Sequence, residues 1–153
     1  MSNAALLLDY LFAGAQIRAR LHAQVPGLAA EDSVQGIETL AQAVEKNIQA
    51  PTVFVLWEGD SIDATDAGRS GRGANQIIHQ QWTLLLAVRN ATQNDPDARN
   101  EAAGPYLSAM HKALAGWAPD GSVRPFTRTQ GRKASYTANV GLYPLTFELT
   151  LHL

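Results

Sequence analysis

The chain has 153 residues, a length typical of one domain, and its 46% hydrophobic and 17% charged residues suffice for one sizeable core. Its formal net charge is −2, so no overall excess of either sign indicates free nucleic acid or a membrane surface as the main partner. It contains no cysteine, which excludes disulfides, thiol catalysis and cysteine-ligated zinc, and no run of about 18 apolar residues that could cross a membrane.

The first element expected is a long N-terminal helix over residues 6–24, whose apolar side chains recur at the helical period. The sequence Val25-Pro26-Gly27 ends it, because proline and glycine break helices. Leu8 and Phe12 fall on the flank of the apolar stripe. They either widen the face that packs on the core or form a contact surface for a neighbouring subunit.

Two strong strands are expected in the middle of the chain. Residues 34–39 and 40–47 predict a short strand and a short helix before them. The stretch "TVFVLWEG" from Thr52 has apolar residues on both sides, which predicts a central strand covered on both faces. Residues 77–89 predict a second strand with one apolar face and one wetter face, the latter marked by His79, Gln81, Thr83 and Arg89.

The last third of the chain predicts a helix and then strands. Residues 98–117 have a helical apolar stripe, with Gly104-Pro105 inside it as a kink or late start. Two short strands are expected near 123–129 and 134–138, and strict alternation over 145–153 predicts a half-buried strand with one wet face. The sum is a single α+β domain over residues 1–153, in which one mainly antiparallel sheet packs against the long N-terminal helix and the mid-chain helix.

The segment "EGDSIDATDAGRSGRGANQ" (58–76) is the first candidate for chemistry. Gly68 and Gly73 have P-loop spacing, but Ala74 and Asn75 replace the required lysine and hydroxyl residue, and a strand follows instead of a helix. The spacing of its aspartates also departs from a calcium-binding loop. We therefore interpret residues 59–76 as a long flexible loop between the two strong strands, mobile until a partner orders it.

No catalytic, metal or cofactor site is expected from the remaining polar residues. The histidines, at positions 22, 79, 111 and 152, have no metal-ligand spacing and lie on predicted wet faces. Trp57, Trp82 and Trp117 fall on apolar stripes, which favours core packing over base stacking. Basic residues gather late in the chain, in what the pattern predicts to be an edge hairpin. Their charges either keep an exposed sheet edge from pairing with another chain, or they contact an acidic partner or passing nucleic acid.

Several stretches, in their order, resemble a known family. They are "PTVFVLWEGD" (Pro51–Asp60), "QQWTLLLAVRN" (Gln80–Asn90), "ALAGWAPDG" (Ala113–Gly121) and "YPLTFELTL" (Tyr143–Leu151). With the N-terminal helix, the long polar loop and the basic segment, they resemble the tail terminator proteins of long-tailed bacteriophages, in particular the Mu-like minor tail protein branch. The resemblance covers residues 6–153, and its most specific piece is the junction "GWAPDG".

The resemblance implies a structural protein that performs no enzymatic step and uses no cofactor. Such proteins form hexameric rings on the head-proximal end of the tail tube, where they stop the addition of tube protein and present a surface to the head-completion or connector protein. Phage DNA passes through the channel without sequence-specific binding, and no membrane is involved. The implied location is the tail of the virion, after assembly in the host cytoplasm.

The candidate contact residues combine the helix flank, the long loop and the basic segment. They are Leu8, Phe12, Asp63, Asp66, Arg69, Arg72, Arg124, Arg128, Arg132 and Lys133. Two other classes of function stay open at this point. One is a head–tail connector or completion protein of a phage or prophage, and the other is a small ligand-binding domain or enzyme whose site assembles in space. A concave apolar pocket with converging polar groups would favour the latter.

Overall fold

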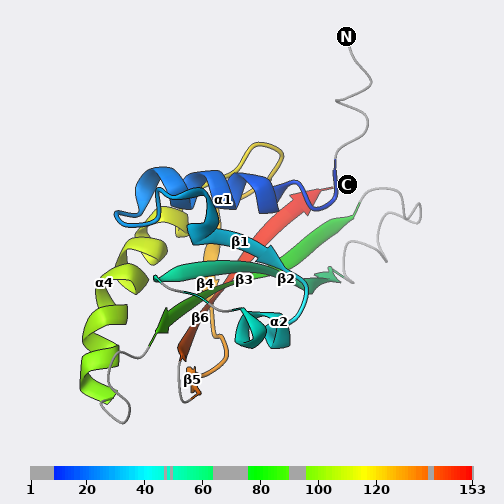
Figure 1. Ribbon diagram of the computed structural model, residues 1–153. Helices are drawn as coiled ribbons and strands as arrows, with labels where there is room; N and C mark the ends of the chain where they lie inside the picture. The colour runs from blue at the N-terminus through cyan, green and yellow to red at the C-terminus, as the bar shows by residue number, and fades with distance from the viewer. Residues whose placement is uncertain are drawn as a thin grey trace.

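The computed structural model describes residues 9–46, 48, 50–63, 76–89, 96–137 and 140–152. Its elements in chain order are α1 (Ala13–Gln24), the 3₁₀ turn η2 (Glu31–Ser33), β1 (Val34–Ile37), α2 (Leu40–Glu45), β2 (Thr52–Ile62), β3 (Ile77–Arg89), α4 (Pro96–Leu114), β4 (Thr127–Thr129), β5 (Ser135–Tyr136) and β6 (Val140–His152). The sheet has the order β1-β2-β3-β6-β4, with β5 also paired to β6 (Figure 1). Only β1 and β2 run parallel among these pairs, so the predicted α+β fold with a mainly antiparallel sheet is confirmed.

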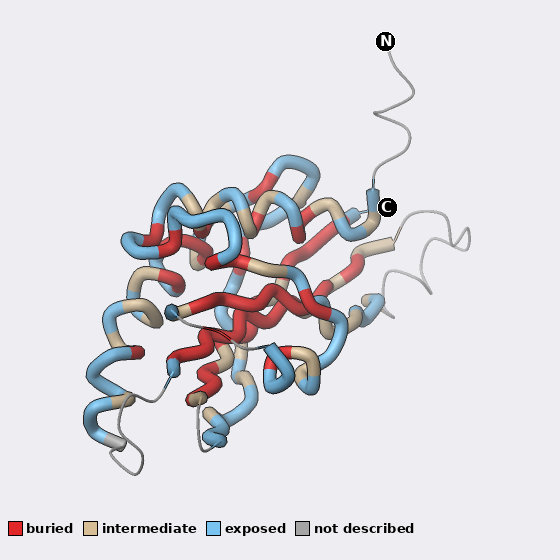
Figure 2. Tube along the Cα trace, viewed as in Figure 1, coloured by how far each residue is buried: buried red, intermediate tan, exposed pale blue. Residues whose placement is uncertain are grey.

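The sheet separates two apolar cores. The larger one lies between the sheet and the helices α1 and α4, and includes Val55, Leu84 and Phe147. The smaller one lies on the opposite face, where α2 packs on Phe54 and Leu85. Because alternate residues of β2 and β3 enter different cores, the middle strands are buried on both faces, as the red central strands of Figure 2 show. The prediction that β2 is covered on both faces is confirmed for Thr52–Leu56, whereas the stretch from Trp57 onward is exposed or half-buried.

Helix α1 begins seven residues later than the 6–24 prediction, at Ala13, and ends at Gln24 as predicted. A turn precedes it, in which the backbone N–H of Phe12 donates to the carbonyl of Asp9 (2.9 Å). The turn is held from the sheet, because the buried Gln80 donates to the carbonyl of Tyr10 (2.8 Å). Side-chain bonding therefore decides where the helix starts, which hydrophobic periodicity alone does not reveal.

The polar side of α1 holds the junction "GWAPDG" that follows α4. The Gln16 side chain donates to the carbonyl of Asp120 (3.0 Å) and accepts from its N–H (2.8 Å). Arg20 donates to the carbonyl of Ala113 (2.9 Å) and lies over the Trp117 ring, 5.1 Å from its centroid. These polar residues thus tie α1 to the chain segment that leads into β4.

The predicted wet faces of β3 and β6 are wrong in part. The wetter face of β3 is buried at Thr83, Leu85 and Ala87, because α2 covers one end of that face and neighbouring polar residues close over Thr83. The alternate face of β6 is likewise buried at Thr146 and Thr150. Exposure of a polar residue cannot be inferred from alternation when another segment crosses the sheet.

The predicted basic hairpin is also not present. Strands β4 and β5 do not pair with each other; each pairs with β6, at Thr146–Glu148 and at Gly141–Leu142 respectively. Between them, the chain crosses the sheet face so closely that a Cβ added at Gly131 would lie 2.8 Å from the Thr146 hydroxyl. The two short strands are therefore a single interrupted edge along β6.

Trp57 departs from the core-packing prediction, whereas Trp82 is buried and Trp117 packs against the core. Trp57 is 36% exposed, because β1 ends opposite Leu56 and leaves the next stretch of β2 open on that side. Its ring meets the edge of the Tyr10 ring at 6.3 Å between centroids. Trp57 is therefore a surface residue at an open sheet edge.

An aromatic cluster joins the start of α4 to the start of β6. Because of it, the free energy of unfolding should depend on pH in the alkaline range. The Tyr143 hydroxyl donates to the Asn100 side chain (3.1 Å), and the Tyr143 ring meets Tyr136 edge-on at 5.8 Å. Burial of the Tyr143 phenol, with a smaller contribution from Tyr136, raises the pKa of Tyr143 to about 12. The native state thus holds the phenol proton more tightly than the unfolded chain, whose tyrosine titrates near pH 10.

We expect this contribution to be fully present below about pH 10 and lost as the pH rises through about 12, amounting to about 2 kcal/mol. Urea unfolding of the wild type and of Tyr143→Phe between about pH 8 and 11 measures it. The wild-type curve should fall more steeply with pH than that of the variant. Two parallel curves would contradict the assignment.

Candidate functional site: a polar row on the sheet

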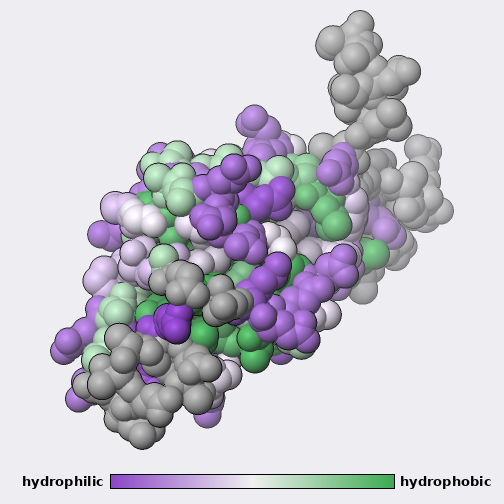
Figure 3. Space-filling view, viewed as in Figure 1, coloured by the Kyte–Doolittle hydropathy of each residue, from purple (hydrophilic) through white to green (hydrophobic). Residues whose placement is uncertain are grey.

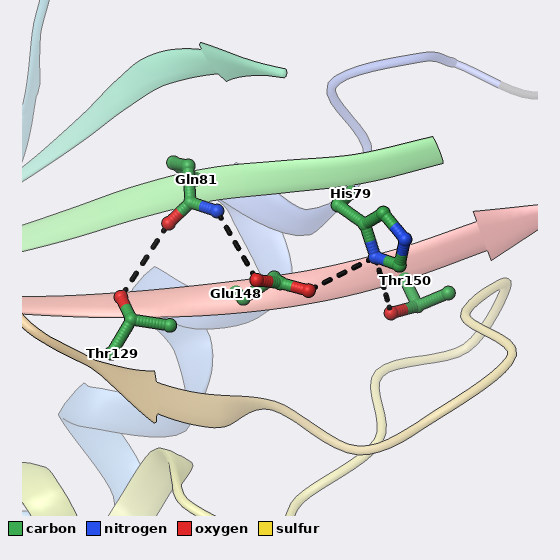
Figure 4. Close-up of polar contacts among 5 residues, drawn as sticks. All are labelled: His79, Gln81, Thr129, Glu148 and Thr150. Atoms are coloured by element: carbon green, nitrogen blue, oxygen red, sulfur yellow. Dashed lines mark hydrogen bonds and ion pairs between the residues drawn. The ribbon is translucent and has the colours of Figure 1, made fainter. Parts of the chain in front are cut away.

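Polar side chains form a row on the second face of the sheet, beyond the part that α2 covers. The row follows from strand register, since Thr83 lies opposite Thr146, Gln81 opposite Glu148 and His79 opposite Thr150. Alternate residues of a strand share a face, so these three cross-strand pairs all project to the same side. Figure 4 shows the outer part of the row, where β4 contributes a further residue, Thr129.

The outer part is centred on Glu148. His79 Nδ1 lies 2.9 Å from one of its carboxylate oxygens, and Gln81 donates to the other (3.4 Å). The Gln81 carbonyl accepts from the Thr129 hydroxyl (3.5 Å), and His79 Nδ1 is 3.2 Å from the Thr150 hydroxyl (Figure 4). The side chains of His79 and Glu148 are 26% and 32% exposed, so solvent reaches the pair.

The inner part is centred on Glu58 and is more buried. A register shift between Trp57 and Gly59 marks a bulge, and Gly59 adopts φ +109°, a left-handed conformation that favours glycine. Glu58 is the extra residue of that bulge and accepts a hydrogen bond from the buried Thr83 hydroxyl. Arg132 pairs with the same carboxylate at 2.6 Å and so fastens the segment between β4 and β5 to β2.

The row does not have the geometry of a hydrolytic site. A Ser-His-Asp type of triad uses one imidazole nitrogen for the nucleophile and the other for the carboxylate. Here the same nitrogen, Nδ1 of His79, faces both the Thr150 hydroxyl and Glu148. Within the part of the chain that the structure describes, no three His, Cys, Asp or Glu side chains are grouped so that they could hold a metal ion. The arrangement fits cross-strand fastening rather than proton transfer.

We expect Glu148→Gln to lower the free energy of unfolding by less than about 1 kcal/mol. An ion pair exposed on this scale gains little over its hydrated partners, and glutamine keeps one of the two acceptor oxygens, so it can still accept from His79 or from Gln81. Urea unfolding near neutral pH measures the change. A loss several times larger would mean that the row carries much more of the stability than its exposure indicates.

Those predicted contact residues that the structure describes lie on several separate surfaces. Phe12 is half-buried against the main core, and Asp63 follows β2, where its N–H donates to the carbonyl of Ile77 (3.0 Å). Arg124 and Arg128 are exposed along the outer side of β6. Arg132 and Lys133 instead lie on the second face, where both line a small depression beside α2. Leu8, Asp66, Arg69 and Arg72 lie outside the described residues, as does most of the 59–76 loop.

Sequence reasoning did not find the polar row, although it found both of the strands that form it. The alternation of His79, Gln81 and Thr83 was visible, and so was that of Thr146, Glu148 and Thr150. Only the pairing register places the two sets opposite each other. Complementary Gln–Glu and Thr–Thr types at matched spacing are the signal that could have suggested this register.

Comparison with known proteins decides the family. A family model described as phage tail terminator protein matches residues 7–153. The chain belongs to the phage tail terminator protein family. Membership makes it a structural phage tail protein, a component of the virion that interacts with other tail and head proteins. The match does not distinguish the Mu-like branch within the family.

No curated protein matches the chain. None of the helices in the described part of this tail terminator is both long enough and apolar enough to cross a membrane.

Proposed function

We propose that this tail terminator caps the head-proximal end of the tail tube as a hexameric ring and stops tube polymerisation. The family match over residues 7–153 is the observation that carries this proposal. The finished ring then offers its outer surface to the head-completion or connector protein, and phage DNA passes through its channel. The protein works by binding alone, without an enzymatic step.

The physical basis of termination is the occupation of a growing surface. A tube grows because each layer presents the surface on which the next layer docks. A cap stops growth if it binds that surface and presents a different one on its other side. A ring with a heterologous, closing interface satisfies both conditions, since every subunit then contacts the tube in the same way.

Electron microscopy of tails assembled with and without the protein tests this function. We expect over-long or unjoined tails in its absence, and normal tails once the wild-type chain is supplied from a plasmid. Tails of normal length that join heads without the protein would overturn the proposal. Binding of the purified protein to tail-free heads, and not to tube ends, would support the connector function instead.

The segment 63–74 gives a separate expectation. Its two ends are held by the pairing of Ile62 with Ile78, so the strands are positioned independently of the connection between them. Shortening 63–74 should therefore leave the melting temperature nearly unchanged, because closure entropy depends weakly on loop length. We propose that the same deletion impairs tail completion, as the candidate contact residues Asp63, Asp66, Arg69 and Arg72 imply. Calorimetry and tail microscopy check the two parts, and an unfolded variant would contradict the first.

A further inference from the structure

The sheet has an open edge beside β2, and a hollow lies there. Strand β1 pairs with β2 only from Val53 to Leu56, so the outer side of Trp57–Ile62 faces no described strand. A hollow of about 990 Å³ opens at this point between α1, the end of β1, α2 and β2. We call it the edge hollow, and its lining includes Leu11, Arg18, Glu38, Glu45 and Trp57.

The edge hollow combines exposed apolar groups with an excess of acid. Leu11 and Trp57 are 40% and 36% exposed, and both line this one hollow. Three acidic residues and two basic residues line it, namely Asp9, Glu38, Glu45, Arg18 and Lys46. No described residue forms an ion pair with Glu38 or Glu45. Hydrophilic side chains with smaller apolar areas between them cover the face of the molecule on which α1, β1 and α2 lie (Figure 3).

The opposite edge of the sheet is basic, which complements the acidic excess of the edge hollow. Strand β4 ends the sheet, and no described strand pairs with its outer side. The chain approaches it along β6, with the N–H of Val123 donating to the carbonyl of Thr150 (2.9 Å). Val123 is 57% exposed, and Arg124 and Arg128 are exposed beside it. We call these three residues and Thr127 the basic edge. Residues 122–136 contain no acidic residue.

Arg128 is positioned by packing rather than by an ion pair. Its guanidinium lies over the face of the Phe147 ring, 6.0 Å from the centroid, and no described acid is paired with it or with Arg124. A guanidinium held on an aromatic ring loses less side-chain freedom when it binds an acid than a fully mobile one does. The basic edge therefore presents two guanidinium groups that no acid among the described residues pairs with.

We propose that the basic edge of one subunit docks into the edge hollow of the next subunit. This inference rests on the proposed ring and names the surfaces that close it. The two surfaces lie at opposite ends of the strand order, so the contact is head-to-tail and can repeat around a closed ring. Arg124 and Arg128 meet Glu38 and Glu45, while Val123 meets Leu11 and Trp57. The contact also covers both open sheet edges, which are otherwise sites of aggregation.

Cysteine cross-linking tests the contact directly, because the natural chain has no cysteine and so gives no background. Ala15 lines the edge hollow, Thr127 lies on the basic edge, and both are exposed and uncharged. A chain with both Ala15→Cys and Thr127→Cys, bound to purified tail tubes and treated with a short bifunctional thiol reagent, should give a ladder up to the full ring. The matched control pairs Ala15→Cys with Ala102→Cys on the exposed side of α4.

A mixture of the two single variants sharpens the test. In a head-to-tail ring, Ala15→Cys and Thr127→Cys chains should cross-link to each other and stop at pairs, whereas neither variant alone should cross-link. A ladder from the control pair, or none from the Ala15 and Thr127 pair on capped tails, would overturn the inference. Cross-linking of one single variant to itself would indicate a two-fold contact and overturn it as well.

Charge exchange supplies an independent measurement. The double variant Arg124→Glu/Arg128→Glu should raise the protein concentration needed to cap half of the tubes by about tenfold or more. Adding Glu38→Lys and Glu45→Lys in the same chain should restore most of the loss, and Lys112→Glu on α4 should leave capping unchanged. No rescue would overturn the inference. A wild-type chain that does not cap tubes at all would instead overturn the proposed function, so the two failures are distinguishable.

Discussion

Phe147→Ala is expected to lower the free energy of unfolding by about 3–5 kcal/mol, since it empties a fully buried aromatic position. Phe147 lies in the main core, where Phe126 meets its ring edge-on at 6.2 Å between centroids. Phe126 in turn stacks on Trp117 at 5.9 Å. A domain of this size has a stability of about 5–15 kcal/mol, so the loss is a large fraction of the total.

The same substitution should also loosen the β4 edge, because β4 pairs with β6 at Thr146, Phe147 and Glu148. Phe147→Leu is the matched control, and a large apolar replacement that can repack costs about 1.5 kcal/mol or less. Urea unfolding followed by circular dichroism measures both variants. Equal stabilities for the alanine and leucine variants would show that the Phe147 site collapses without leaving a cavity.

Strands β2 and β3 and the segment from β1 to α2 followed from the sequence because their signals are local. Apolar residues on both sides of 53–56 indicate a buried strand whatever lies next to it, and the structure confirms it. The bounds of β3, residues 77–89, also agree with the prediction. The segment 34–47 predicts a short strand and a short helix, and it forms both. In each case the backbone conformation depends mainly on the pattern of residues within the element itself.

Pairing and exposure could not be read in the same way because they depend on distant segments. Nothing in residues 123–138 reveals that both short strands pair with β6 instead of with each other. Trp57 lies on an apolar stripe, yet it is exposed because β1 is too short to pass it. Thr83 looks like a surface residue in its own strand, but Glu58 and Thr146 enclose its hydroxyl.

The placement of the basic residues could not be predicted for a related reason. Basic residues that are close in sequence were expected to act together, but the crossing of the sheet by residues 130–134 separates them. Arg132 binds Glu58 and holds the fold, while Arg124 and Arg128 remain at the opposite edge without a described acidic partner. Charge clusters in sequence therefore become functional surfaces only after the topology has assigned each residue to an edge or a face.

Gln80→Leu is expected to lower the free energy of unfolding by about 2–3 kcal/mol, although leucine is apolar and of similar size. Gln80 is completely buried, donates to the carbonyl of Tyr10 (2.8 Å) and accepts from the Trp82 indole N–H (3.1 Å). Leucine removes the partner of the buried Trp82 indole N–H and of the part-buried Tyr10 carbonyl, and each unsatisfied buried group costs about 1–3 kcal/mol, which added apolar contact offsets only in part.

The neighbouring Gln81→Leu is the matched control, because Gln81 is half-exposed and its hydrogen bonds of 3.4 and 3.5 Å are long. It should change the free energy of unfolding by about 1 kcal/mol or less. Equal losses in the two variants, measured by urea unfolding, would show that the Gln80 bonds do not stabilise the fold. Because Tyr10 precedes Leu11, which lines the edge hollow, Gln80→Leu should also weaken tube capping more than Gln81→Leu does. That second measurement connects one buried amide on β3 to the position of α1 and, through it, to the surface on which the ring is proposed to close.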